Sequence, residues 1–426
     1  MWVVDIEKML DGDEADLPTS PAEEWRSHSI FRVPSHFKMV RGNNAFKPQT
    51  VTLGPFHHDR DSHAIMEGHK RTAVRHLLRR AGKPLRELAA AMEEVANEME
   101  DAYDGLDGEW RGRNRGRFLE MMIADGCFLL EVMRNYNWDF SDYTPSDPVF
   151  SPHAVVHIAV LLQRDMLMIE NQLPLLLLQR IVAVEGRPSD DVAINKLVLG
   201  FLGMDIDSAA NVGTRLGPGL QPLELYRRSL LGANKKATVP RSAQKLWEAG
   251  IRFSPSNTDF LDDVSFHGRR HELRMPLVVL DDSTEYIYNN VMAFEALHAG
   301  TGNDVTAFVL FMRDMVHSVD DVARLRMAGI LMHGDLTGSN GAVVALLHGL
   351  TKDVVKIGNS WLFAVRDAVE IHCRDSWRLF VFESWANLRK TYFTTALTFS
   401  IFFLITDLMR TAYAVMSYEL TKHRHG

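Results

Sequence analysis

One stretch near the C-terminus constrains the architecture of this 426-residue chain more than any other. From Thr391 to Thr406 the sequence carries no charge. Extended to Met409, the segment would form a helix about 28 Å long, close to the thickness of the hydrocarbon core of a bilayer. The sequence therefore predicts a single transmembrane helix from Thr391 to Met409.

The residues that flank this segment fit a membrane crossing. Arg389 and Lys390 precede it, and long basic side chains can reach the lipid headgroups. At the other end, Asp407 and Arg410 are three residues apart on one helix face, where they can pair. Thr and Ser are frequent in the uncharged segment, and Asp407 lies only about 10 Å from the centre of the segment. A buried C-terminal helix packed on the domain is therefore the alternative.

Composition limits what the rest of the chain can be. Hydrophobic residues make up 46% and charged residues 24%, a balance typical of globular proteins. The net charge of −8 argues against non-specific binding of nucleic acid, which needs a basic surface. The two cysteines, Cys127 and Cys373, exclude a disulfide framework. Asp5 and Glu7 interrupt any N-terminal signal sequence, so we expect the domain in the cytosol.

Hydrophobic periodicity and turn residues predict a mainly α fold: a large helical domain with one small β-sheet, followed by the transmembrane helix. An acidic N-terminal extension (1–29) precedes the helical domain (30–390), and a short tail (410–426) follows the membrane segment (391–409). Within the domain, the Gly- and Pro-rich stretch 205–240 is expected to be an exposed, variable excursion.

Several elements can be placed individually. A basic helix (65–80) and an acidic helix (87–101) are joined by a Gly-Pro turn, which suggests an antiparallel hairpin. The apolar stretch 154–184 contains Pro174, which should kink or split it. Strands are expected around the turn 267–270, and a helix is expected to run from 319 to 332.

A loop rich in histidine is the candidate metal site. His57, His58 and His63 lie together with Asp59 and Asp61, and such side chains can bind zinc or a similar metal. Their spacing matches no defined metal motif, so a solvated loop is the competing interpretation. The sequence assigns no metal, no cofactor and no catalytic residue.

Two polar clusters contain carboxylates that could serve acid–base chemistry. Asp281, Asp282 and Glu285 could act as paired carboxylates, but an acidic capping box at the start of a helix explains all three. The polar run 170–172 interrupts an apolar stretch. A hydrogen-bonded network that braces the break at Pro174 explains this run better than catalysis by Glu170 does.

Two further features have structural and functional interpretations. Cys127 is expected in the core, whereas Cys373, next to His372 and Arg374, is the more reactive candidate. The basic run 111–117 is either a solvated linker or a contact for anionic lipid.

Several strings taken together resemble one plant family, known as domain of unknown function 247. The resemblance runs from about Ile30 to the C-terminus and is carried by Ile30-Phe31-Arg32-Val33-Pro34, Pro48-Gln49-Thr50-Val51-Thr52-Leu53-Gly54-Pro55-Phe56-His57-His58, Met66-Glu67-Gly68-His69-Lys70, Met121-Met122-Ile123-Ala124-Asp125-Gly126-Cys127-Phe128-Leu129-Leu130-Glu131, Glu170-Asn171-Gln172-Leu173-Pro174, Glu248-Ala249-Gly250-Ile251-Arg252-Phe253, Asp281-Asp282-Ser283-Thr284-Glu285 and Ala293-Phe294-Glu295.

This resemblance implies a plant source and a single C-terminal membrane span. Some grass members of the family are associated with pollen–stigma self-incompatibility, where they look like recognition determinants rather than enzymes. No catalytic residues are established for the family, so none can be transferred to this chain. The basic run 111–117 departs from the family pattern.

Together, these observations predict a membrane-tethered, cytosol-facing recognition or signalling module. Its partners would be membrane lipid, through the C-terminal helix, and unidentified proteins. The plasma membrane is the favoured location. The alternative is a membrane-anchored enzyme with a pocket near Glu170 or His57.

Overall fold

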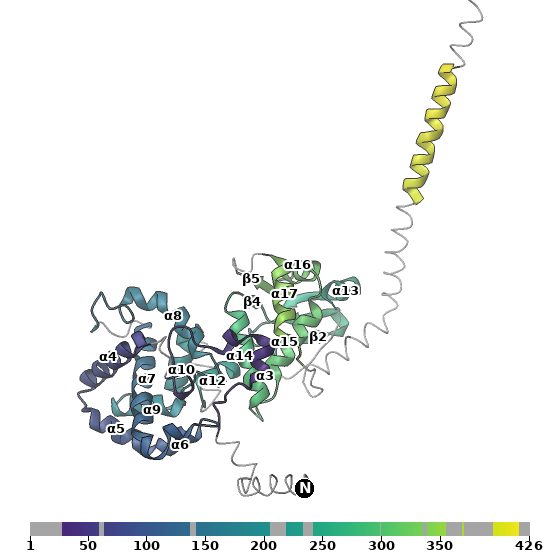
Figure 1. Cartoon of the computed structure of the whole chain (residues 1–426). Coiled ribbons are helices and arrows are strands. Elements are labelled where there is room, and N and C mark those ends of the chain that lie inside the picture. Colours follow the sequence, from purple (N-terminus) through teal and green to yellow (C-terminus); the bar gives the residue numbers. More distant parts are fainter. Residues whose placement is uncertain are drawn as a thin grey trace, which may run out of the picture.

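The described part of the protein consists of two helical lobes and a separate C-terminal helix (Figure 1). The computed structural model describes residues 28–58, 64–136, 142–204, 219–232, 242–298, 300–334, 339–354, 369 and 395–416. Most of the extension 1–29, the long helix expected over 359–390, the tail beyond Met416, His63 and Cys373 therefore lie outside the described residues. The mainly α fold class is confirmed.

The N-terminal lobe is built around α7 (Arg115–Tyr136), which is buried along most of its length. Its apolar side chains form one contiguous core with those of the surrounding helices. These helices are α4 (Ala64–Ala81), α5 (Leu85–Glu94), α6 (Ala96–Asp101), α8 (Pro152–Met166), α9 (Leu175–Val184) and α10 (Asp191–Phe201).

The C-terminal lobe has its own apolar core, formed by short helices and strands. Its helices are α12 (Pro222–Ser229), α13 (Ala243–Glu248), α14 (Thr284–Leu297), α15 (Asp304–Met315), α16 (Val319–Met327) and α17 (Asn340–Leu350). Its strands are β1 (Arg252–Pro255), β2 (Ser265–His267), β3 (Glu272–Met275), β4 (Val278–Leu280) and β5 (Leu331–His333).

The strands form two small sheets rather than one. In the first sheet, β3 lies between β1, which is parallel to it, and β2, which is antiparallel to it. In the second, β4 pairs in parallel with β5. The expected turn between β2 and β3 is present, and β3 ends before Pro276. Leu331–His333 is a strand, although the sequence suggested that a helix ends there.

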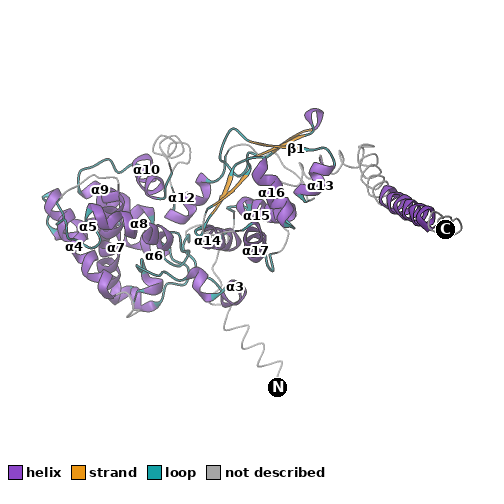
Figure 2. Cartoon of the chain, turned by 90° about the horizontal axis from the view of Figure 1, so that it is seen from above, coloured by secondary structure: helices purple, strands orange, loops and turns teal. Residues whose placement is uncertain are grey.

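The segment 28–58 connects the two lobes. Helix α3 (Ser35–Arg41) and the short 3₁₀ turn Asn43–Phe46 lie against the C-terminal lobe, where Val33 and Phe46 enter its core. Leu53 and Phe56 enter the core of the N-terminal lobe instead. In Figures 1 and 2, α3 lies beside the C-terminal lobe although it comes first in the sequence.

Two predicted arrangements are wrong. The basic helix α4 packs mainly on α7 and not on the acidic helix α5, because its inward charges are paired by carboxylates of α7. The middle of the expected exposed excursion, 219–232, is largely buried. There α12 inserts Leu223 and Leu225, each fully buried, between neighbouring helices. The flanks 205–218 and 233–240 lie outside the described residues.

The stretch 154–184 is split as Pro174 predicted. Helix α8 ends at Met166, and α9 begins at Leu175, directly after the proline. The residues between them, 167–174, form an irregular buried connection. This connection carries the polar run 170–172 into the region where the two lobes meet.

The C-terminal helix runs from Thr395 to Met416 and has none of its residues buried. Its 22 residues have a mean hydropathy of 1.4, long and apolar enough to cross a membrane by length and composition. It continues seven residues beyond Met409, the predicted end, while Thr391–Thr394, Arg389 and Lys390 lie outside the described residues. The alternative, a C-terminal helix packed on the domain, does not apply to the described residues, since Phe402 and Phe403 are 61% and 68% exposed.

Candidate functional site

The polar run 170–172 forms hydrogen bonds with the extended segment 48–54. We call this hydrogen-bonded junction, together with Asp165 of α8, the latch. Asn171 is fully buried; its Oδ1 accepts from the backbone N–H of Leu53 at 2.7 Å. Its Nδ2 donates to the backbone carbonyls of Val51 and Asp165. One amide side chain thereby forms hydrogen bonds with the extended backbone that a neighbouring β-strand would otherwise provide.

The side chains of Asp165 and Gln172 also bind backbone groups in the latch. The carboxylate of Asp165 accepts three backbone N–H groups, those of Gln49, Thr50 and Val51, at 2.6–2.8 Å. The side chain of Gln172 donates to the carbonyl of Met166 at the end of α8 and to that of Met168, and it accepts from the N–H of Leu223. These contacts join α8, the segment 48–54 and α12.

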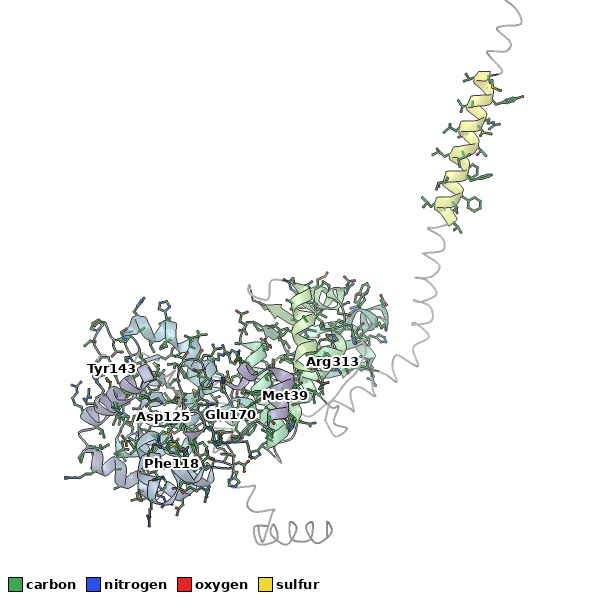
Figure 3. All side chains as sticks on the ribbon, in the orientation of Figure 1. Met39, Phe118, Asp125, Tyr143, Glu170 and Arg313 are labelled. Carbon is green, nitrogen blue, oxygen red and sulfur yellow. The ribbon has the colours of Figure 1, made fainter. Side chains whose placement is uncertain are left out.

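Glu170 extends the latch to helix α3. Its Oε1 accepts from the N–H of Val33 at 2.8 Å and from the Nζ of Lys38 at 2.6 Å, while the Nε2 of His57 lies 3.3 Å from Oε2. Burial would raise the pKa of Glu170, but the hydrogen bonds from His57 and Lys38 outweigh it and hold the pKa below its usual value. Figure 3 shows Glu170 where the two lobes meet.

This geometry suits a structural carboxylate. Glu170 stays ionised and is already in contact with three donors, the N–H of Val33, Lys38 and His57, so it is a poor general acid. The expected hydrogen-bonded network is confirmed, and it braces the whole connection 167–174 rather than Pro174 alone. Neither of the two clefts described below is lined by Glu170 or His57.

A second polar group, missed from the sequence, lies inside the N-terminal lobe. The fully buried Lys70 of α4 places its Nζ 2.6 Å from Oδ1 of the buried Asp125 on α7. It also donates to Glu67 and to the carbonyl of Thr52. Burial would lower the pKa of Lys70, but Asp125 and Glu67 outweigh it and raise the pKa.

A sequence signal for this lysine did exist. Met66, Lys70, Ala73 and Leu77 follow one another at the spacing of a single helix face, and three of the four are apolar. A lysine within an apolar stripe must be paired when the stripe is buried. The stripe therefore predicts an acidic partner on the facing helix, though it does not say which one.

The two described histidines of the predicted metal loop face different partners. His57 is buried and faces Glu170, whereas the ring of His58 meets the edge of Trp110 at 5.2 Å between centroids. His63 and the two aspartates lie outside the described residues. Among the residues that the structure describes, no group of three or more His, Cys, Asp or Glu side chains could hold a metal ion.

The acidic cluster at the start of α14 is a helix cap, though not the predicted box. Asp281 Oδ1 accepts from the backbone N–H groups of Ser283 and Thr284, which closes the turn before the helix. Asp282 and Glu285 are exposed and do not form the reciprocal bonds of a capping box.

The basic run 111–117 is partly helical. Arg115 begins α7 and pairs with Glu100, and Arg117 lies over the Trp110 ring. Arg111 and Arg113 remain exposed. Cys127 is buried as predicted, and burial raises the pKa of its thiol, so it is an unreactive core residue.

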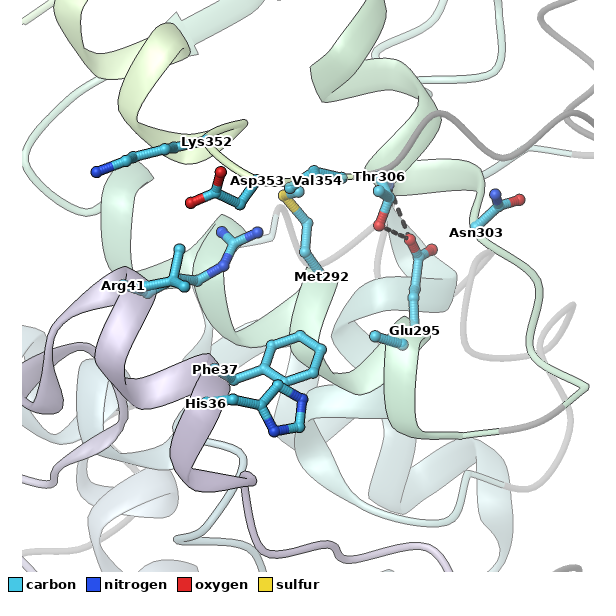
Figure 4. Close-up of a pocket in the computed structure, with 12 residues that line it drawn as sticks. His36, Phe37, Arg41, Met292, Glu295, Asn303, Thr306, Lys352, Asp353 and Val354 are labelled. Carbon is cyan, nitrogen blue, oxygen red and sulfur yellow. Dashed lines mark hydrogen bonds between the residues drawn. The ribbon is translucent and has the colours of Figure 1, made fainter.

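The C-terminal lobe carries an apolar cleft of about 280 Å³ (Figure 4). Phe37 and Arg41 come from α3, Met292 from α14, and Lys352 from the loop after α17. Arg41 also borders a second, more polar depression next to α14. Nothing in the sequence singles out this arginine, because its neighbours in space are far away along the chain.

The C-terminal helix satisfies several of its own polar side chains. The hydroxyls of Thr398, Thr406 and Thr411 donate to backbone carbonyls three or four residues earlier. Such bonds let threonine lie in an apolar environment. Asp407 and Arg410 both lie on this helix, and its described residues show no ion pair between them, contrary to the prediction.

Comparison with known proteins gives a family and no activity. The chain matches the model of a plant family, DUF247, described as a plant protein of unknown function, over residues 30–408. It is 24% identical over 437 residues to the UPF0481 protein At3g47200 of Arabidopsis thaliana, covering 93% of this chain and 88% of that protein. It is 22% identical over 505 residues to the putative UPF0481 protein At3g02645 of the same plant, covering 89% and 91%. No solved structure matches the chain.

Proposed function

The chain belongs to the plant DUF247 family, and on this basis we propose that it is a membrane-anchored recognition module. In this proposal the C-terminal helix spans a bilayer, and the two-lobed domain binds protein partners on the cytosolic side. The role would lie in signalling or in recognition of the self-incompatibility type. The plasma membrane is the membrane we favour.

One observation carries the proposal: a long apolar helix that no other described part of the chain covers. Leu404, Ile405 and Leu408 are each more than half exposed, as are the aromatic side chains beside them. Exposing such side chains to water costs about 25 cal/mol per Å² of apolar surface. A bilayer removes this cost, and the intrahelical threonine bonds leave fewer polar groups to be buried in lipid.

The polar junctions in the domain support a binding rather than a catalytic role. The carboxylates of Asp165 and Glu170 are occupied by backbone N–H groups and by Lys38, which leaves them little freedom to react. The alternative, an enzyme acting near Glu170 or His57, would need a substrate to displace these contacts. The two lobes joined by the latch provide instead a firm support for surface loops that bind partners.

Membrane extraction tests the anchor. We expect the full chain to remain in the membrane pellet after alkaline carbonate and to require detergent for release. A double substitution, Phe402→Arg with Ile405→Arg, should release the chain, because each arginine costs roughly 2.5–3.5 kcal/mol near the centre of a span. The matched control Thr398→Val should stay in the pellet. Recovery of the unaltered chain in the soluble fraction would refute the anchor.

Orientation needs a separate measurement. A glycosylation acceptor inserted into the tail 417–426 should be modified if the tail crosses the membrane, while an acceptor in the exposed loop at Gly112 should not. The opposite pattern would place the domain outside the cytosol and contradict the proposed orientation.

A further inference from the structure

The structure points to a ligand site in the apolar cleft of the C-terminal lobe, and we propose that this cleft binds a small apolar molecule with one carboxylate group. The site is independent of the membrane anchor, since it lies in the domain alone. Apolar side chains line much of it, and two cations, Arg41 and Lys352, border it.

The guanidinium of Arg41 is bound by neutral acceptors. Its Nη1 donates to Oδ1 of Asn289 and to the carbonyl of Leu350, both neutral acceptors. Within the described part of the chain, Arg41 forms no ion pair. Burial lowers the pKa of Arg41, as expected for a cation without a counter-ion. A half-buried, uncompensated charge of this kind favours an anion as partner.

The acidic groups around the cleft do not fill this role. Glu295 is already bound by Arg227 and by the backbone N–H groups of Val305 and Thr306. Asp353 lines the same wall without pairing with Arg41, and Lys352 beside it adds a positive charge. On the other side of the arginine, Asp282 and Glu285 border the second depression and are solvent-exposed.

The geometry of the guanidinium selects a carboxylate. Nη1 is occupied, and among the described residues no hydrogen bond involves Nε or Nη2, which present two parallel N–H donors along one edge. Such an edge matches the two oxygens of a planar carboxylate, and pairs of this type are among the strongest hydrogen bonds in proteins. Figure 4 shows the Arg41 side chain extending toward Met292, into the cleft.

The remaining surface sets the size and polarity of the ligand. Phe37, Val40, Met292, Ala296 and Val354 offer apolar contacts. At about 280 Å³ the cleft is slightly below the 300–1,000 Å³ typical of small-molecule sites. It therefore fits a compact ligand, such as an aromatic ring or a short aliphatic chain attached to the carboxylate.

Binding of matched probes tests the proposal. The full-length protein in detergent micelles would be titrated with 3-phenylpropionate, octanoate and 1-naphthoate by calorimetry and by saturation-transfer NMR. We expect saturable one-to-one binding of at least one acid. Its neutral amide should bind at least about tenfold more weakly, because a charged hydrogen bond is lost.

Two variants locate the site. Arg41→Gln removes the charge, and Ala296→Phe places an aromatic ring in the cleft from an exposed position on α14. Each should weaken binding of the acid at least about tenfold, whereas Arg113→Gln, an exposed arginine elsewhere, should bind as the unaltered chain does. If Arg41→Gln fails to fold, Ala296→Phe decides alone.

Three results would overturn the proposal. The first is the absence of saturable binding for all three acids at millimolar concentration. The second is equal binding of acid and amide, which would mean partition into micelles or apolar surface. The third is binding that persists unchanged in a folded cleft variant.

Discussion

Replacing Lys70 by methionine should destabilise the N-terminal lobe strongly. Lys70 is fully buried, and its ammonium lies 2.6 Å from the equally buried carboxylate of Asp125. After Lys70→Met, Asp125 keeps one donor, the N–H of Gly54, and the carbonyl of Thr52 loses its donor. Removing one partner of a buried ion pair costs about 3–5 kcal/mol. For a lobe of this size that corresponds to a fall in Tm of roughly 6–20 °C.

A double variant separates the uncompensated charge from lost packing. Lys70→Met combined with Asp125→Asn removes the buried charge at position 125, and the asparagine can still accept from the N–H of Gly54. We expect it to recover about 1–3 kcal/mol relative to Lys70→Met alone. The control Lys83→Met removes an exposed pair with Glu87 and should change stability by less than about 1 kcal/mol.

Thermal unfolding of the full chain in micelles, followed by near-UV circular dichroism, measures these differences. The reasoning fails if Lys70→Met is no less stable than Lys83→Met. It also fails if the double variant is as unstable as Lys70→Met, since the uncompensated charge of Asp125 would then not be the cause.

Two further predictions concern the core and the latch. Gly126→Ala on α7 should destabilise the protein by about 1 kcal/mol, because its Cβ would lie 2.6 Å from Ile181 Cδ1 and 2.9 Å from Leu177 Cδ2 on α9. The control Gly68→Ala, at an open position on α4, should stabilise the protein by roughly 0.5–1 kcal/mol. Equal effects of the two variants in unfolding experiments would contradict the close approach of α7 and α9. Because the pKa of Glu170 is lowered in the folded state, its contribution to stability is complete above about pH 4.5 and is lost as the pH falls through the folded-state pKa. Urea unfolding of Glu170→Gln should therefore depend less on pH in that acidic range than unfolding of the unaltered chain. Parallel pH profiles of the two proteins would refute this role of Glu170.

Local patterns in the sequence were sufficient for the main elements. The uncharged segment after Lys390 predicted an unburied C-terminal helix, and Pro174 predicted the split between α8 and α9. The segment 48–54 is extended, which its flanking prolines and its β-branched residues explain. These features depend on neighbours along the chain, so a single sequence can reveal them.

Pairing between distant segments could not be predicted in this way. Opposite charges on the adjacent helices α4 and α5 suggested a hairpin, yet the partner of Lys70 is Asp125, 55 residues further along. The Gly- and Pro-rich stretch 205–240 seemed exposed, yet its helix α12 is buried because the side chain of Gln172 and the neighbouring helices complete its contacts.

The cleft at Arg41 shows this division most clearly. Nothing near Arg41 in the sequence distinguishes it from the other arginines of the chain. Its character arises because α3 docks against α14 and the end of α17, segments about 250 to 310 residues away. Helix and turn preferences are local properties that the sequence alone determines. The environment of a charge depends on which distant surfaces exclude water from it, and only the tertiary structure decides that.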